Sequence, residues 1–180
     1  MIRELKFGWL QCFFSLAVIF SIAGCKQDQV LADQFLPIPD RSWELTYLPE
    51  MTVHVKEQKG PYKVFVNLRH TDQYRYSNIF LLIHQNQELP AAPNDSVRSE
   101  FIKVPSKKVT KRVELTLAEP DGRWTGSHSG NFYTSQQLVW QDYFFPDTGV
   151  FVLSLEQNMR ENPLKHVVAG GFRIELAQKR

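Results

Sequence analysis

Cysteine is scarce in this chain, which has two among its 180 residues, Cys12 and Cys25. Both lie in the first 25 residues, where a short charged head precedes an apolar run from Phe7 to Phe20. That run is shorter than the roughly 20 apolar residues of a membrane-spanning helix, and it is typical of a secretory signal peptide. We therefore expect residues 1–24 to be removed as a signal peptide.

The signal ends in Ile22-Ala23-Gly24-Cys25, which resembles the bacterial lipobox. This resemblance implies cleavage before Cys25 and acylation of its thiol, so that the mature chain keeps no free thiol. A disulfide scaffold, a thiolate nucleophile and a cysteine zinc site are then excluded. Several acyl chains, at ~0.8 kcal/mol per buried methylene, hold a protein firmly on a membrane. We expect a lipid-anchored protein of the outer membrane, facing the periplasm or the cell surface.

An excess of one charge is also absent, because the formal net charge is +2. A nearly neutral chain gives no electrostatic basis for binding nucleic acid. No histidine has a partner histidine two or four residues away, so we predict no metal site and no cofactor; the five are His54, His70, His84, His128 and His166. Gly126–Gly130 has His128 at its centre instead of the serine that an esterase elbow requires. The carboxylates are scattered, and we predict neither an enzyme nor a small-molecule substrate.

From Trp43 onward, apolar residues alternate with polar ones, which is the pattern of half-buried strands. The alternating sets are Trp43–Tyr47, Met51–Val55, Tyr62–Leu68, Val113–Leu117, Phe151–Leu155 and Phe172–Leu176. Continuous apolar runs at Ile79–Ile83 and Leu138–Phe145 indicate two further strands. Together they predict an all-β fold, a single antiparallel β-sandwich of jelly-roll or immunoglobulin-like type, with a closed lipocalin-like sheet as the alternative.

The remaining segments lack this alternation. Residues 25–40, which are the lipidated cysteine and a polar stretch with two prolines, are interpreted as a tether, so the sandwich domain is placed at 41–180. Gln157–Lys165 is expected to hold a helical turn or two. Phe101–Val104 is expected to be a short edge strand. The basic run from Lys103 to Arg112 is interpreted as a solvated loop, with docking to an acidic partner or to lipid headgroups as the alternative.

Six stretches follow the lipobox in a fixed order: Tyr62–His70, Tyr74–Leu81, Leu115–Gly126, Gly149–Phe151, Glu156–Arg160 and Gly171–Glu175. In their order and spacing they resemble the gliding motility lipoprotein GldH family of Bacteroidetes. The resemblance implies a non-enzymatic component or accessory of the gliding motility and type IX secretion apparatus. It also implies other gliding or secretion envelope lipoproteins as partners, besides the membrane itself.

The matched stretches contain three arginines that a sandwich core cannot hold unpaired: Arg69, Arg160 and Arg173. We expect Glu156 or Glu175 to supply ion pairs within the domain. The alternative is a partner-docking surface formed by Arg160, Gln157 and Met159.

Aromatic residues make up 13% of the chain, and flat exposed rings are the means by which carbohydrate-binding modules hold sugars. A lipid-anchored glycan-binding module is therefore the alternative function, with Trp124 and Trp140 as the rings to test first. Against it, a domain of this size needs most of its rings for the core. Asp95-Ser96-Val97 resembles the short O-glycosylation motif of Bacteroidetes and marks Ser96 as a candidate modification site.

Overall fold

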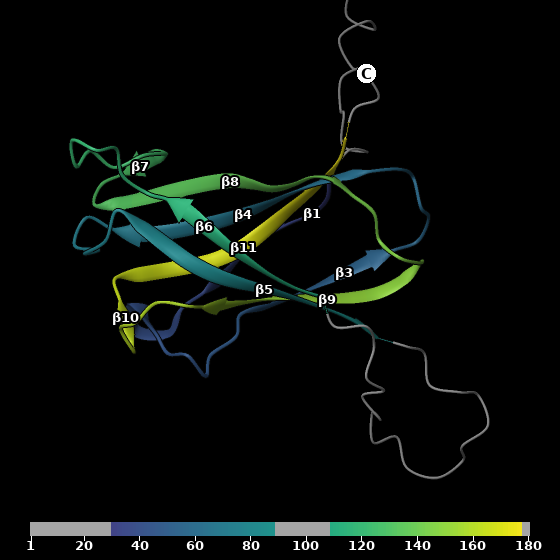
Figure 1. The fold of residues 1–180 in the computed structure, drawn as a ribbon, viewed down its shortest axis with the longest axis horizontal. Helices are drawn as coiled ribbons and strands as arrows, with labels where there is room; N and C mark the ends of the chain where they lie inside the picture. The colour runs from purple at the N-terminus through teal and green to yellow at the C-terminus, as the bar shows by residue number, and fades with distance from the viewer. Residues whose placement is uncertain (1–29, 89–108, 178–180) are drawn as a thin grey trace, which may run out of the picture.

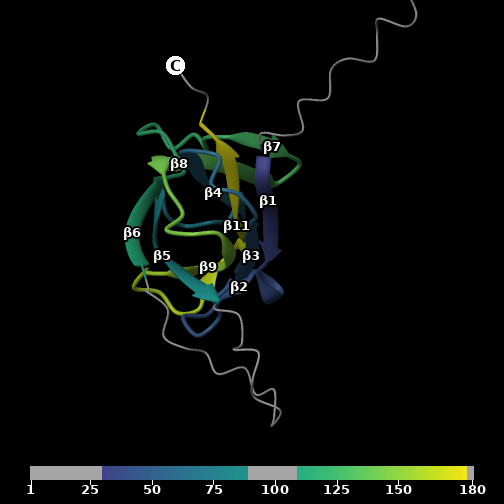
Figure 2. The ribbon, with the colours of Figure 1, turned by 90° about the vertical axis from the view of Figure 1, so that its right-hand side faces the viewer.

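The computed structural model describes residues 30–88 and 109–177, which form two antiparallel sheets packed face to face (Figures 1 and 2). The larger sheet contains, in spatial order, β1 (Val30–Pro37), β11 (Val167–Leu176), β4 (Tyr62–Thr71), β8 (Phe132–Tyr143) and β7 (Ser127–Ser129). The smaller sheet contains β3 (Glu50–Val55), β9 (Gly149–Gln157), β5 (Asn78–Glu88) and β6 (Val109–Thr116). A short ribbon pairs β2 (Ser42–Trp43) with β10 (Leu164–Lys165), and the 3-10 helix η3 (Pro39–Arg41) precedes it. The predicted β-sandwich is confirmed.

Alternating side chains from both sheets form the core between the layers. In β3, for example, Met51, Val53 and Val55 are buried, whereas Thr52 and His54 are exposed. The largest buried side chains come from both layers and from the ribbon: Trp43, Phe151, Phe172 and Met51. The two sheets keep separate edge strands, β1 and β7 in one and β3 and β6 in the other, so the closed lipocalin-like alternative is wrong.

The first strand corrects the sequence interpretation. We predicted a tether over residues 25–40, but Val30–Pro37 form β1 and pair with β11 along its length. The ladder register shifts between Val30 and Ala32, and most of the outer side of this edge strand faces solvent. A bulge interrupts the two-residue period, and an exposed edge needs few apolar residues, so the sequence carried no strand pattern here.

Two other predictions are also wrong. The strand expected at Trp43–Tyr47 is two residues long, because the chain turns after Trp43 and the indole Nε1 donates to the Tyr47 carbonyl oxygen at 2.8 Å. The helical turn expected within Gln157–Lys165 is absent, since an irregular loop leads into β10. The edge strand expected at Phe101–Val104 lies outside the described residues. No helix of the described part is long and apolar enough to cross a membrane.

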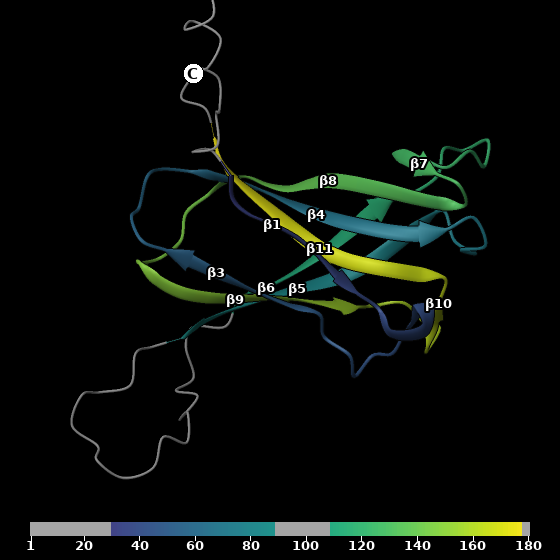
Figure 3. The same cartoon turned by 180° about the vertical axis from the view of Figure 1, so that it is seen from behind.

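The sandwich has two ends with different loops (Figures 1 and 3). At the Val30 end, the start of β1 lies beside the end of β11, and the loops 56–61 and 144–148 connect the two sheets. At the Thr71 end lie η3, the turn after β4, the β7–β8 turn and β10.

Candidate functional site

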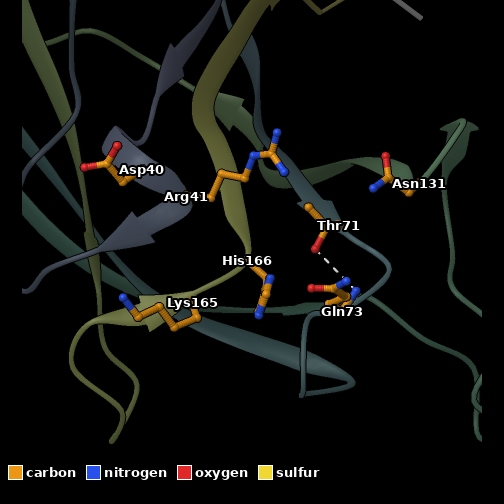
Figure 4. A pocket seen from close by; sticks show the side chains of 7 residues that line it. All are labelled: Asp40, Arg41, Thr71, Gln73, Asn131, Lys165 and His166. Atoms are coloured by element: carbon orange, nitrogen blue, oxygen red, sulfur yellow. Dashed lines mark hydrogen bonds between the residues drawn. The ribbon is translucent and has the colours of Figure 1, made fainter.

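A polar pocket of about 190 Å³ lies at the Thr71 end, where four separate segments of the chain meet (Figure 4). Its lining comes from η3, the end of β4 with the following turn, the β7–β8 turn, and β10 with the residue after it: Asp40, Arg41, Thr71, Gln73, Asn131, Lys165 and His166. Thr71 is buried at its base, His166 is half-buried and the other side chains are exposed. The pocket is therefore open to a ligand or partner from solvent.

Backbone hydrogen bonds fix the four segments relative to one another. The His166 N–H donates to the Arg41 carbonyl oxygen at 2.8 Å, and the Thr71 N–H donates to the His166 carbonyl oxygen at 3.0 Å. The Asp72 N–H donates to the Asn131 carbonyl oxygen at 3.0 Å. Backbone hydrogen bonds therefore fix the positions of the four segments, and the pocket's shape does not depend on its side chains alone.

Three residues of this pocket adopt left-handed backbone conformations. Asp40, Arg41 and His166 have φ angles of 51°, 54° and 70°, and they are the non-glycine residues with positive φ within 30–88 and 109–177. A left-handed residue with a side chain costs roughly 1–2 kcal/mol. Such conformations persist when their surroundings impose them, and they concentrate at functional sites. Their coincidence here singles out this pocket as the candidate site.

The pocket presents hydrogen-bond donors and positive charge. The Arg41 guanidinium lies 5.4 Å from the Phe132 ring centre, and among the described residues it has no carboxylate within ion-pair distance. Figure 4 shows the Asp40 carboxylate turned away from that guanidinium. Lys165 Nζ donates to the Ser42 hydroxyl at 2.8 Å, and Figure 4 shows its ammonium group pointing away from Thr71 and His166. The arrangement suits an acidic or amide-bearing group of a partner.

Within residues 30–88 and 109–177, the pocket holds no hydrogen-bonded pair of a nucleophile and a base. The Thr71 hydroxyl accepts a hydrogen bond from the Gln73 N–H at 3.3 Å, and no hydrogen bond joins it to His166 in the described structure. A triad-like site needs a base in hydrogen-bond contact with its nucleophile. Nor do the described residues bring three His, Cys, Asp or Glu side chains together as a metal-ligand set.

The sequence did not reveal this pocket. Of its lining residues, His166 alone was considered, as one of five scattered histidines. The four segments are far apart along the chain, and each contributes one or two ordinary polar residues. The signal that was available is positional: Thr71 and Lys165 each end a strand, and strand ends of a sandwich gather at two edges.

His70 lies behind the pocket in an aromatic cage. Its side chain is fully buried, and the ring centres of Trp124, Tyr74 and Tyr133 are 4.6, 5.3 and 5.7 Å away. Nδ1 donates to the Thr71 carbonyl oxygen at 2.8 Å, which leaves Nε2 as a bare acceptor without a hydrogen-bond partner. Burial lowers the pKa of His70, so the ring is neutral at pH 7. The role of His70 is structural, because its hydrogen bond to the Thr71 carbonyl oxygen helps to fix the residue that lines the pocket.

The docking surface predicted at residues 157–160 separates into two roles. Gln157 is fully buried, its Nε2 donates to the Glu161 carbonyl oxygen at 3.2 Å, and its Oε1 accepts from the Met159 N–H at 2.9 Å. The Met159 sulfur accepts from the Phe80 N–H at 3.3 Å. Gln157 and Met159 therefore shape the loop, whereas Arg160 is exposed at its surface. A docking role stays a prediction, and Arg160 is the residue placed to perform it.

Of the other two arginines, Arg173 forms ion pairs within the domain, whereas exposed Arg69 has a hydroxyl partner and no ion pair among the described residues. Arg173 contacts Glu175 at 3.1 Å, as the sequence predicted, and Asp33 of β1 at 2.6 Å. The hydrogen bond to Asp33 is the main cause that raises the pKa of Arg173. The Asp33 contact was missed because its strand was interpreted as a tether. Arg69 donates to the Thr134 hydroxyl at 3.1 Å.

The remaining pairing predicted by the sequence differs in the structure. Glu156, expected to pair with an arginine, instead contacts His84 Nε2 at 2.7 Å.

Trp124 and Trp140, the rings first considered for glycan binding, are half-buried and pack against the core. Cys25, Ser96 and three lysines of the basic run lie outside the described residues: Lys103, Lys107 and Lys108.

Comparison with known proteins gives a consistent result. The sequence model of the family described as "GldH lipoprotein" matches residues 30–102 and 93–174. The curated "Gliding motility lipoprotein GldH homolog" of Christiangramia forsetii is 26% identical over 171 residues, which cover 91% of this chain and 93% of that protein. No solved structure matches the chain significantly.

Proposed function

The chain belongs to the GldH lipoprotein family, and from that premise we propose that it is a lipid-anchored, non-enzymatic component or accessory of the gliding motility and type IX secretion apparatus. Its acyl anchor is Cys25, and it resides at the outer membrane. Its role is to bind other envelope lipoproteins of that apparatus.

The family match carries this proposal, because it extends over both sheets and both ends of the sandwich. The relative from Christiangramia forsetii, whose printed name is that of a gliding motility lipoprotein, covers nearly the whole chain as well. The resemblance seen in the sequence is confirmed by these matches at the level of the family.

The structure supports a binding role at the Thr71 end. Arg41 and Arg160 are both exposed there, on loops held by backbone hydrogen bonds or by a buried glutamine. Arginine is enriched in protein interfaces, and a fixed loop loses little conformational entropy on binding. An exposed arginine without a carboxylate partner is ready to pair with an acidic group of another protein.

The two rings first considered for glycan binding, Trp124 and Trp140, are not placed to stack on a sugar. Trp124 lies against His70, and Trp140 against Tyr143, with ring centres 4.6 and 5.3 Å apart. Both indoles pack against the core, so neither offers the open flat face that sugar stacking requires.

The test is a deletion in the native host, complemented with wild type, Cys25→Ala and Arg160→Ala, with surface spreading and protein secretion scored together. We expect the deletion to lose one or both traits, and wild type to restore them. Cys25→Ala should fail because the protein leaves the membrane. Arg160→Ala should reach normal amounts and yet restore the traits incompletely. A deletion strain that spreads and secretes normally would contradict the proposed function.

A further inference from the structure

The sandwich begins much closer to the predicted acyl anchor than the sequence suggested. β1 starts at Val30, five residues after Cys25. A fully extended chain spans at most about 3.6 Å per residue, so this link reaches about 18 Å. If Cys25 is acylated as proposed above, the Val30 end of the domain cannot move farther than that from the lipid.

The loop 144–148 lies at the same end of the molecule. Tyr62 in β4 pairs with Leu176 at the end of β11 on one side and with Tyr143 at the end of β8 on the other. From β1 to β8 there are three strand spacings of about 4.8 Å, which gives about 14 Å across the sheet. Figure 3 shows the start of β1 and the end of β8 at this common end. Phe144 follows Tyr143 directly.

Phe144 is the most exposed of the large hydrophobic side chains in the described part, with 63% of its surface accessible. The next residue, Phe145, is 3% exposed, and its ring lies between those of Phe151 and Tyr62, whose centres are 4.8 and 5.5 Å away. Gln58 Nε2 also donates to the Phe145 carbonyl oxygen at 3.2 Å. The buried Phe145 thus fixes the loop, and the fixed loop presents Phe144 to solvent.

Lysines accompany this phenylalanine. Lys56 and Lys59 are exposed in the loop 56–61, to which Gln58 connects the Phe144 loop. Lys59 has a distant contact of 3.8 Å with Glu57, and both side chains are largely exposed. Glu57 and Asp147 are exposed in the same two loops, so their charges balance those of the two lysines. The exposed aromatic ring is therefore the group that suits the headgroup layer, because such a ring enters the apolar boundary while neighbouring charged groups stay at the phosphates.

We propose that the Val30 end rests on the same bilayer that holds acylated Cys25, with the Phe144 ring seated in the headgroup layer. This rests on the proposed acylation and goes beyond it by fixing the orientation of the domain. β4 has ten residues at about 3.3 Å each, so the Thr71 end stands at most about 33 Å farther from the bilayer than the Val30 end. The competing orientation lays the outer face of the larger sheet, with exposed Phe35 and Leu138, on the lipid.

Site-specific fluorescence in vesicles tests the orientation. The lipidated protein would carry one engineered thiol, Phe144→Cys, Phe35→Cys or Leu45→Cys, because acylation of Cys25 leaves no other thiol. Leu45 is the matched control, since it is 41% exposed and its N–H bonds Asn162 at the Thr71 end. Each variant receives an environment-sensitive dye and is reconstituted in phosphatidylethanolamine and phosphatidylglycerol vesicles, with or without doxyl-labelled lipid.

We expect a blue shift and loss of emission in doxyl vesicles for the dye at 144, and neither for the dyes at 35 and 45. Quenching at 35 without quenching at 144 would overturn the proposal in favour of the sheet face. A protein that floats with the vesicles but is quenched at none of the three positions would overturn it too, and would leave the acylation intact. A protein that does not float at all would contradict the acylation, and the orientation with it.

Discussion

Replacing His70 with asparagine should flatten the pH dependence of folding stability between about pH 7.5 and about pH 5.5. His70 is fully buried, and its Nδ1 donates to the Thr71 carbonyl oxygen. The groups packed against it are the rings of Trp124, Tyr74 and Tyr133, and none of these contacts is with a carboxylate. Burial raises the pKa of Tyr74, so that phenol stays neutral. A proton added at Nε2 would therefore create a buried cation without an acceptor.

The direction of the effect follows from the lowered pKa of His70 in the folded state. Above the unfolded value of about 6.5, both states carry a neutral ring and the folded state keeps its full stability. Below it, the unfolded state binds a proton that the folded state excludes, so stability falls as the pH falls towards the folded pKa. The slope for one proton is at most about 1.4 kcal/mol per pH unit.

Urea denaturation of the mature chain at several pH values measures this slope. His70→Asn keeps a donor for the Thr71 carbonyl oxygen and loses the ring packing, so we expect about 2 kcal/mol less stability at pH 7.5 and a smaller slope below about pH 6.5. His54→Asn is the control, because His54 is exposed on β3 and its replacement should leave the slope unchanged. A wild-type protein with equal stability at both ends of the range, or a His70→Asn variant that keeps the slope, would refute the reasoning.

Two further pairs of substitutions test the fold at particular contacts. Gly171→Ala should cost about 1–3 kcal/mol, because a Cβ there would clash with the backbone carbonyl oxygen of Gln34 and push β1 away. Gly170→Ala should cost less in the same thermal melts, because its Cβ would meet a side-chain methyl of Leu155 at 3.1 Å and no backbone atom. Gln157→Ala should lower the free energy of unfolding by about 1–3 kcal/mol, because it leaves buried polar groups of the loop unpaired. Arg160→Ala should stay within about 0.5 kcal/mol of wild type, because Arg160 is exposed. Equal losses of stability would contradict a structural role for Gln157 and a docking role for Arg160.

The sequence predicted those strands that have one buried and one exposed face. In β3 and β9 the two-residue period survives, because one face lies on the core along the whole strand. The sequence did not predict β1, because a bulge interrupts its two-residue alternation and its outer side chains are exposed to solvent. For the same reason the sequence did not predict the Asp33–Arg173 ion pair, because Asp33 lay in a segment interpreted as a tether.

The pocket at the Thr71 end was beyond sequence reasoning for a different reason. Left-handed backbone is usually signalled by glycine, but here Arg41 and His166 adopt it under the control of hydrogen bonds between distant segments. Nothing local in the sequence encodes those bonds. By contrast, Arg173 and Glu175 were paired correctly, because they lie two residues apart on one face of one strand.

The short link to Cys25 and the polar pocket have a joint consequence for the partner. A tether of fifteen or so residues, as the sequence suggested, would let the domain tumble and present any face to the apparatus. If Cys25 is acylated as proposed, five residues of link confine the Val30 end, and the sandwich transmits that constraint to the Thr71 end about 33 Å away. A partner that pairs with Arg41 or Arg160 must then offer acidic groups at that height. A folded domain outside the bilayer meets this requirement, and a partner confined to the lipid does not.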